Sequence, residues 1–174
     1  DIGCGMDFIP TNVRVEDIKD VQTGNGTMIQ TMIGNIMRAI PLNMERYKVP
    51  QPSDVLDGAK QEMEKYADDP ELIPLIDDGY FQVGSLGGGN HFIELQEDQD
   101  GYLCLMIHSG SRHLGKEICD HFHQKARELN QMWYSEVKEQ YRLAFLPVRS
   151  DEGQRYIHWM NLAMDYAFEN RARM

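Results

Sequence analysis

Two strand-like stretches joined by a short polar turn constrain the fold of this chain more than any other feature. They cover residues 91–95 (HFIEL) and 102–108 (YLCLMIH), and residues 98–101 between them are typical of turns. This pattern predicts an antiparallel hairpin over residues 91–108. The histidine that begins the hairpin and the histidine that ends it should therefore lie at the same end.

Helical periodicity precedes the hairpin. One helix is expected to start near Asn25 or Thr27 and to stop at Pro41, with a Met-rich apolar stripe that we interpret as core. A second helix is expected after Ser53, and residues 80–83 are a candidate for a short strand.

Two further helices are expected after the hairpin. The first has an apolar stripe from Ile118 to Trp133 and ends before Pro147; the second begins after Ser150. A strand-rich middle flanked by helices predicts an α+β fold.

Length and chain ends bear on domain organisation. With 174 residues and 41% hydrophobic content the chain can bury the core of a single domain, residues 1–174. It starts with Asp1 within a glycine motif and ends at Met174 within a helical pattern. We therefore expect an internal fragment of a longer protein.

Charge and cysteine content exclude some classes of protein. A net charge of −11 argues, by itself, against a broad basic face for nucleic acid, although a missing segment could supply one. Three cysteines without a secretion signal indicate reduced thiols and a cytoplasmic protein. No apolar run is long enough to span a membrane.

Three glycine-rich motifs carry polar side chains: DIGCGM (1–6), GGGNHFIEL (87–95) and HSGSRHLG (108–115). Bare backbone there lets a ligand or metal approach closely. Carboxylate, thiolate and imidazole together are ligands of borderline to soft divalent ions. Taken singly, Cys4 could be a small turn residue and each histidine a structural one. Taken jointly, the motifs favour a metal site formed by Asp1, Cys4, His91 and His108.

The third motif also suggests an anion site. The backbone amides of the Ser109–Ser111 turn and the guanidinium of Arg112 suit phosphate or carboxylate, next to the start of a helix. An anion close to the metals is therefore expected, with Ser109, Ser111 and Arg112 as its contacts.

Other candidates are weaker. The glycines of GSLGGGN precede a strand and not a helix, so a dinucleotide loop is not indicated. Asp120, His121 and His123 do not share a helix face, which disfavours a chelate. Cys104 is interpreted as core and Cys119 as an inert residue beside a buried stripe.

The three motifs, in this order, resemble the signature blocks of the RtcB family of RNA-splicing ligases, and AMDYAFENR near the end is similar to the helix that follows them. The resemblance covers essentially the whole chain, but only the middle part of such a protein. It implies an RNA ligase that depends on GTP and manganese. Such an enzyme joins a 3′-phosphate or 2′,3′-cyclic phosphate end to a 5′-hydroxyl end through guanylylated intermediates, in tRNA splicing or RNA repair.

The resemblance also implies roles for residues. Asp1, Cys4 and His91 would hold one Mn²⁺, and Cys4 and His108 the other. The nucleotide would lie against the NHFIE block. This block consists of Asn90, His91, Phe92, Ile93 and Glu94.

Two expectations qualify this mapping. Strict alternation places His91 and Glu94 on opposite faces, so both reach one pocket only if the strand bulges, twists or has not begun at His91. The guanylylated histidine and a third histidine ligand would lie beyond Met174, so the fragment alone should be inactive.

Two alternatives remain open at this point. The parent could be a regulatory homologue that binds metal and nucleotide without ligating, or a metallohydrolase acting on phosphate esters. The sequence identifies neither the RNA substrate nor the oligomeric state.

Overall fold

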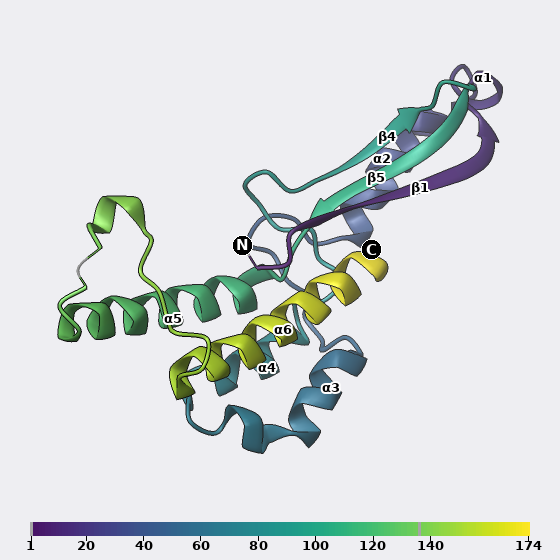
Figure 1. Cartoon of the computed structure of the whole chain (residues 1–174). Coiled ribbons are helices and arrows are strands. Elements are labelled where there is room, and N and C mark those ends of the chain that lie inside the picture. The colour runs from purple at the N-terminus through teal and green to yellow at the C-terminus, as the bar shows by residue number, and fades with distance from the viewer. Residues whose placement is uncertain (1, 136) are drawn as a thin grey trace.

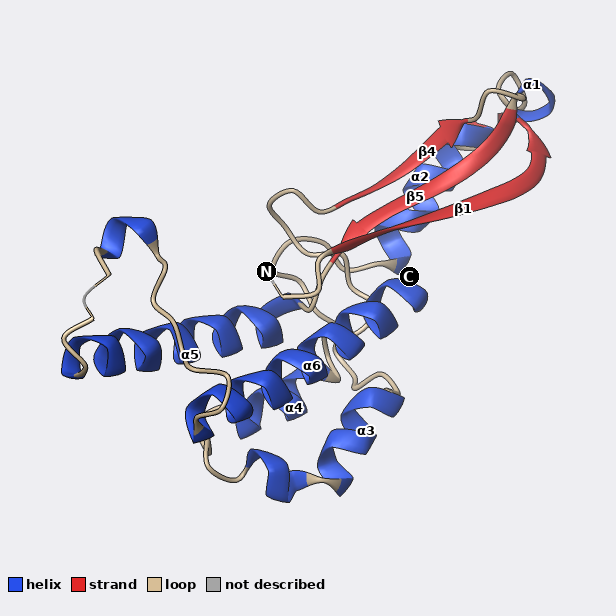
Figure 2. Ribbon diagram, in the orientation of Figure 1, coloured by secondary structure: helices blue, strands red, loops and turns tan. Residues whose placement is uncertain are grey.

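The computed structural model describes residues 2–135 and 137–174 and shows an α+β arrangement. A three-stranded antiparallel sheet forms one end of the molecule, and a group of helices forms the other (Figures 1 and 2). The start of β1 and the end of α6 lie at the junction between the two parts (Figure 1). The predicted fold class is therefore confirmed.

The sheet has the order β1-β5-β4, with β1 at Gly5–Arg14, β4 at Phe92–Glu97 and β5 at Tyr102–Ser109. The predicted hairpin is confirmed as β4 and β5, which pair with Phe92 opposite His108. Strand β1 was not predicted. It contains Pro10, which an edge strand tolerates because one side of its backbone needs no partner.

Short elements follow β1. Helix α1 (Val15–Ile18) leads to a two-stranded ribbon of β2 (Gln22–Thr23) and β3 (Gly26–Thr27), and helix α2 covers Met28–Ala39. The expected cap is confirmed: the Thr27 hydroxyl accepts a hydrogen bond from the Gln30 backbone amide, and the Gln30 side-chain oxygen accepts one from the Thr27 backbone amide.

The core role expected for α2 is wrong. None of its residues is buried, and Ile33 and Met37 are among the exposed large apolar side chains. Amphipathic periodicity shows that a helix has an apolar face, but it does not show what covers that face.

The helical part contains the core. It consists of α3 (Asp54–Gln61), η1 (Met63–Tyr66), α4 (Ile73–Gly79), α5 (Arg112–Met132), η2 (Glu139–Tyr141) and α6 (Asp151–Ala172). The predicted caps Ser53 and Ser150 accept hydrogen bonds from the amides of Leu56 and Gly153. Fully buried side chains from α3, α4, α5 and α6 meet in one cluster. Its most buried members include Trp159, Tyr166, Phe122, Leu56, Ile76 and Ile118.

The strand expected at residues 80–83 is wrong. This segment continues α4 as a series of turns, in which the amides of Gln82 and Val83 bond to the Gly79 carbonyl. A short apolar run does not distinguish a strand from the end of a helix, and here local turn bonds prevail.

The cysteines differ in environment. Cys104 is fully buried, as expected, whereas Cys119 is exposed on α5. Among the described residues, no helix has both the length and the apolar character needed to cross a bilayer.

Candidate metal centre

The sheet topology brings together side chains from the first, second and third glycine-rich motifs. Strands β1 and β4 run in the same direction on either side of β5, so the starts of β1 and β4 lie beside the end of β5. Cys4 directly precedes β1, His91 directly precedes β4, and His108 is the penultimate residue of β5. The three side chains therefore converge at the end of the sheet that faces the helices.

The sulfur of Cys4 lies between the two imidazoles. Its Sγ atom is 3.4 Å from Nε2 of His91 and 3.1 Å from Nε2 of His108, while the ring centroids are 5.6 Å apart. A sulfur placed between two imidazole nitrogens is suited to bridge two cations, each with its own histidine. Asp1 lies outside the described residues, so its predicted role stays a prediction.

Backbone contacts orient His91. Its Nδ1 atom lies 2.9 Å from the Leu86 carbonyl, so the proton resides on Nδ1 and the Nε2 lone pair faces Cys4. A metal-bound histidine commonly uses its second ring nitrogen in this way. Burial lowers the pKa of His91, the bond to Leu86 opposes this, and the charge of Arg112 lowers it further. The imidazole is therefore neutral at neutral pH, as metal binding requires.

The glycine at position 87 makes room for this arrangement. It has φ of +94°, and a Cβ there would lie 1.8 Å from Nη1 of Arg112 and 2.5 Å from Nδ1 of His91. Any side chain would thus collide with both groups. The first glycine of the GGGN stretch is therefore required by the packing of Arg112 and His91.

Arg112 is a fixed cation beside His91. It adopts φ of +58°, which is uncommon for a residue with a side chain. Its Nε donates to the Ser85 hydroxyl and its Nη2 to the Asn43 carbonyl. No carboxylate among the described residues pairs with it. The guanidinium therefore places a positive charge next to the imidazole of His91.

A groove of about 980 Å³ opens at this point. His91 and Arg112 line it at one end, and α5 forms one wall. Basic or ionisable side chains along it are Arg46, His113, Lys116, His123 and Arg142, interspersed with Glu45, Asp78 and Asp120.

The serine hydroxyls of the third motif have other partners. Ser109 and Ser111 are fully buried; Ser109 Oγ donates to the Leu86 carbonyl, and Ser111 Oγ donates to the Ile2 carbonyl. These bonds join the motifs to each other. A contact of either serine with phosphate stays a prediction.

The NHFIE block divides between the two faces of the sheet. Because β4 begins at Phe92, His91 precedes the strand, which removes the conflict over alternation. Phe92 and Glu94 lie opposite His108 and Met106, on the face that carries the histidine, whereas Ile93 lies opposite Ile107 on the other face. Asn90 and Glu94 are exposed. Their predicted contact with a nucleotide is untested.

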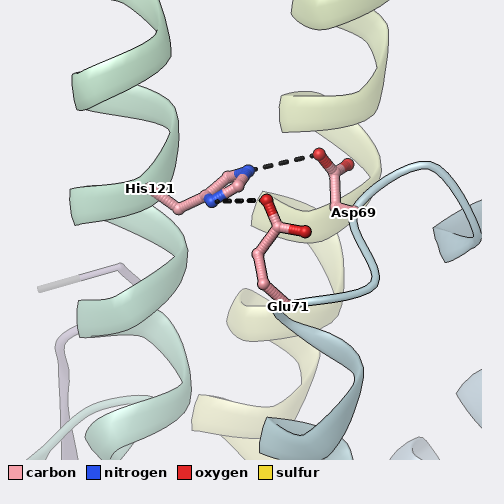
Figure 3. A group of neighbouring side chains, drawn as sticks. All are labelled: Asp69, Glu71 and His121. Atoms are coloured by element: carbon pink, nitrogen blue, oxygen red, sulfur yellow. Dashed lines mark hydrogen bonds and ion pairs between the residues drawn. The ribbon is translucent and has the colours of Figure 1, made fainter.

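A second group of potential ligands lies elsewhere. Asp69, Glu71 and His121 present atoms within 4.8 Å of one another (Figure 3). His121 Nε2 is 3.2 Å from Asp69 Oδ1, and its Nδ1 is 3.4 Å from Glu71 Oε1. This set of donors is compatible with a cation.

Neighbouring cations already neutralise Asp69, however. Lys125 Nζ is 2.5 Å from Oδ1, Arg155 Nε is 3.7 Å from Oδ2, and Trp159 Nε1 donates to Oδ2. Burial raises the pKa of Asp69, but the bonds to Lys125 and His121 outweigh it, and the net shift is downward. A metal would have to displace Lys125, so we interpret this group as an ion-pair network that joins α5 and α6 to the loop before α4.

Sequence reasoning missed two residues that support the first site. Asn170 and Arg171, near the end of α6, bond to backbone carbonyls next to Cys4 and His108 and in the loop that precedes His91. A signal was present, because Ala163, Ala167 and Asn170 follow helical spacing. A polar residue within a stripe of buried apolar residues indicates a specific hydrogen-bonding role.

The whole chain, residues 1–174, matches the family model described as tRNA-splicing ligase RtcB. It is 32% identical over 209 residues to RNA-splicing ligase RtcB homolog 2 of Entamoeba dispar, covering 98% of this chain and 38% of that protein. It is 26% identical over 210 residues to tRNA-splicing ligase RtcB of Methanococcus maripaludis, covering 98% and 42%. RNA-splicing ligase RtcB of Mycobacterium tuberculosis is 38% identical over 108 residues, covering 53% and 24%. The chain thus spans about two fifths of the length of the relatives that match nearly all of it.

Proposed function

Because the chain belongs to the RtcB family, we propose that the complete protein is an RNA ligase that uses GTP and two Mn²⁺ ions. It joins RNA with a 3′-phosphate or 2′,3′-cyclic phosphate end to RNA with a 5′-hydroxyl end. The names of the relatives, RNA-splicing and tRNA-splicing ligases, support this activity class.

The observation that carries the proposal is the position of Cys4 between His91 and His108. In the proposed site Cys4 would contribute to both ions, His91 and Asp1 would hold one of them, and His108 would hold the other. Two bound cations would share the negative charge that develops on a phosphate during its displacement. The neutral His91, held by Leu86, and the exposed Cys4 thiol are suited to hold them.

Arg112 is proposed to bind the RNA phosphate. Its guanidinium is anchored through two of its nitrogens and lies beside His91, so it can place an anion close to the metal centre. Because the Arg112 side chain is already anchored, less conformational entropy is lost when it binds a phosphate. The groove along α5 gives the RNA a path toward this point.

The guanine nucleotide is proposed to lie against Asn90 and the β4 residues that follow it. Glu94 and Phe92 share the sheet face of His108, which supports their contact with a ligand at the metal centre. Exposure of Asn90 and Glu94 leaves their side chains accessible.

The test is ligation by the complete protein. RNA with a 3′-phosphate is incubated with a 5′-hydroxyl RNA, GTP and Mn²⁺, and joined product is measured. We expect GTP-dependent joining that Cys4→Ala abolishes, whereas His158→Ala, which removes an exposed imidazole from α6 away from the groove, leaves it intact. Binding of metal and GTP without joining would instead indicate a regulatory homologue, and phosphate release without GTP would indicate a metallohydrolase.

A further inference from the structure

We propose that Asn170 and Arg171 of α6 are positioning residues that set the spacing of Cys4, His91 and His108. The inference rests on the proposed metal site. It concerns two side chains that touch neither metal nor substrate and act through the backbone of the ligand-bearing loops.

Arg171 connects the segment of Cys4 to that of His108. Its Nη1 atom donates to the carbonyl of Gly3, at 3.0 Å, and to the carbonyl of Ser109, at 3.1 Å. Gly3 directly precedes Cys4, and Ser109 directly follows His108. One nitrogen atom thus fixes the backbone next to both ligands.

The position of Arg171 is itself fixed. Its side chain is only 10% exposed, and its Nε lies 3.3 Å from Oδ2 of Asp7 on β1. A Cβ at position 5 would lie 2.9 Å from its Cζ, so the second glycine of DIGCGM makes room for the guanidinium. The first glycine, Gly3, has φ of +75°, and a Cβ there would lie 2.8 Å from Cβ of Ala167. Both glycines around Cys4 are therefore explained by α6.

Asn170 connects the segment of His91 to that of His108. It is fully buried, and its Oδ1 accepts bonds from the amides of Gly84 and Ser85. Its Nδ2 lies 3.1 Å from three oxygen atoms. These are Ser85 O, Ser109 Oγ and Gly110 O.

This second connection ends on a ligand. Ser109 Oγ, which contacts Asn170, donates to the Leu86 carbonyl, and the same carbonyl accepts the Nδ1 proton of His91. Asn170 therefore fixes the loop that orients His91. The site's three described ligands are held through two adjacent residues of one helix.

The physical consequence concerns metal affinity. A cation gains most from ligands that are already at the correct separation, and groups that orient ligands typically contribute about 10- to 100-fold to affinity. The segment around Cys4 precedes an edge strand, so loss of Arg171 should increase the mobility of this segment. The core cluster around Trp159 should remain packed.

The experiment compares wild type, Arg171→Ala, Arg171→Lys and Arg173→Ala in the complete protein. Cobalt(II) serves as the probe, because a thiolate ligand produces a charge-transfer absorption band. Arg173→Ala is the matched control: it removes an arginine of the same helix end that pairs with Glu169 and not with the ligand loops. Amide hydrogen exchange of residues 2–9 is measured in metal-free protein.

We expect Arg171→Ala to weaken cobalt(II) binding by at least about tenfold and to accelerate exchange in residues 2–9. Arg171→Lys should restore part of the cobalt(II) affinity and part of the protection from exchange. Its ammonium group can reach the two carbonyls but cannot keep the Nε contact with Asp7. Arg173→Ala should match wild type. If Arg171→Ala does not fold, the comparison of Arg171→Lys with wild type takes its place.

Equal cobalt affinity and equal exchange in wild type and Arg171→Ala would overturn the inference. Absence of a thiolate band in wild-type protein would instead refute the proposed metal site. In that event, faster exchange in Arg171→Ala would still support the positioning role of Arg171, and unchanged exchange would refute that role.

Discussion

The Sγ atom of Cys4 lies 3.1 Å from Nε2 of His108, although 104 positions separate the two residues in the sequence. Antiparallel pairing of β1 with β5 accounts for this, because Met6 lies opposite His108 in the sheet. The start of the first strand and the end of the last are thus adjacent by topology, and Arg171 of α6 donates hydrogen bonds to the backbone of both segments.

Metal preference follows from the ligand types. One thiolate and two imidazoles favour Zn²⁺ over Mn²⁺. We predict that Zn²⁺ binds more tightly than Mn²⁺, by at least about tenfold, and that Zn²⁺ competes with Mn²⁺ in ligation. Calorimetric titration of the metal-free protein measures both affinities. Substitution Cys4→Ser should reduce the preference for Zn²⁺, and an unchanged preference would exclude Cys4 as a ligand.

Gly87→Ala should disrupt the site without unfolding the protein. The added Cβ would collide with Arg112 and His91, so metal affinity and ligation should both fall at least about tenfold. Gly89→Ala is the control, because Gly89 also has positive φ but has nothing within 4 Å of an added Cβ. That control should lose only about 1 kcal/mol of stability. Equal losses of metal affinity in the two variants would show that backbone strain at positive φ, and not the collision with Arg112 and His91, causes the loss.

The pKa of His91 should respond to Arg112. Burial is the main cause of its lowered pKa, and the positive charge of Arg112 adds to it. Replacing Arg112 with Ala removes this charge, so the pKa of His91 should rise toward its ordinary value while burial keeps it below. NMR titration of the imidazole in metal-free protein measures the change. Arg142→Ala, at an exposed residue farther along the groove, should leave the pKa unaltered.

Asp69 should contribute to stability in a pH-dependent way. Burial raises its pKa, but Lys125 and His121 lower it more, so the folded state favours the carboxylate. The sign follows: this contribution is complete above the unfolded-state pKa, about 3.9, and is lost as pH falls through the lower folded-state value.

Removing that carboxylate tests the network. Asp69→Asn should lower the free energy of unfolding at pH 7 by about 3 kcal/mol, because it leaves Lys125 and Arg155 without their shared partner. Urea unfolding at pH 7 and pH 3 measures this, and the difference from wild type should shrink at the lower pH. Asp77→Asn, which removes the partner of the exposed Lys60, should cost less than about 1 kcal/mol. A metal-dependent loss of stability in Asp69→Asn would instead favour a cation at Asp69, Glu71 and His121.

The sequence alone was sufficient to predict the helix caps, the β4-β5 hairpin and the candidate metal-binding side chains. Helix caps at Thr27, Ser53 and Ser150 were predictable because a hydroxyl that satisfies free amides acts within a few residues. The β4-β5 hairpin was predictable because its turn and its apolar stretches are contiguous. The glycine-rich motifs identified Cys4, His91 and His108 as candidates through residue type.

Tertiary structure decided which segments of the chain contact one another. The exposure of α2, the pairing of β1 with β5, and the ion pairs of Asp69 depend on segments distant in sequence, so no local pattern encodes them. The same holds for Asn170 and Arg171, whose partners lie at least 60 positions away. Spacing within a helix shows which face a residue occupies, but only packing of the whole chain determines which backbone groups that face meets.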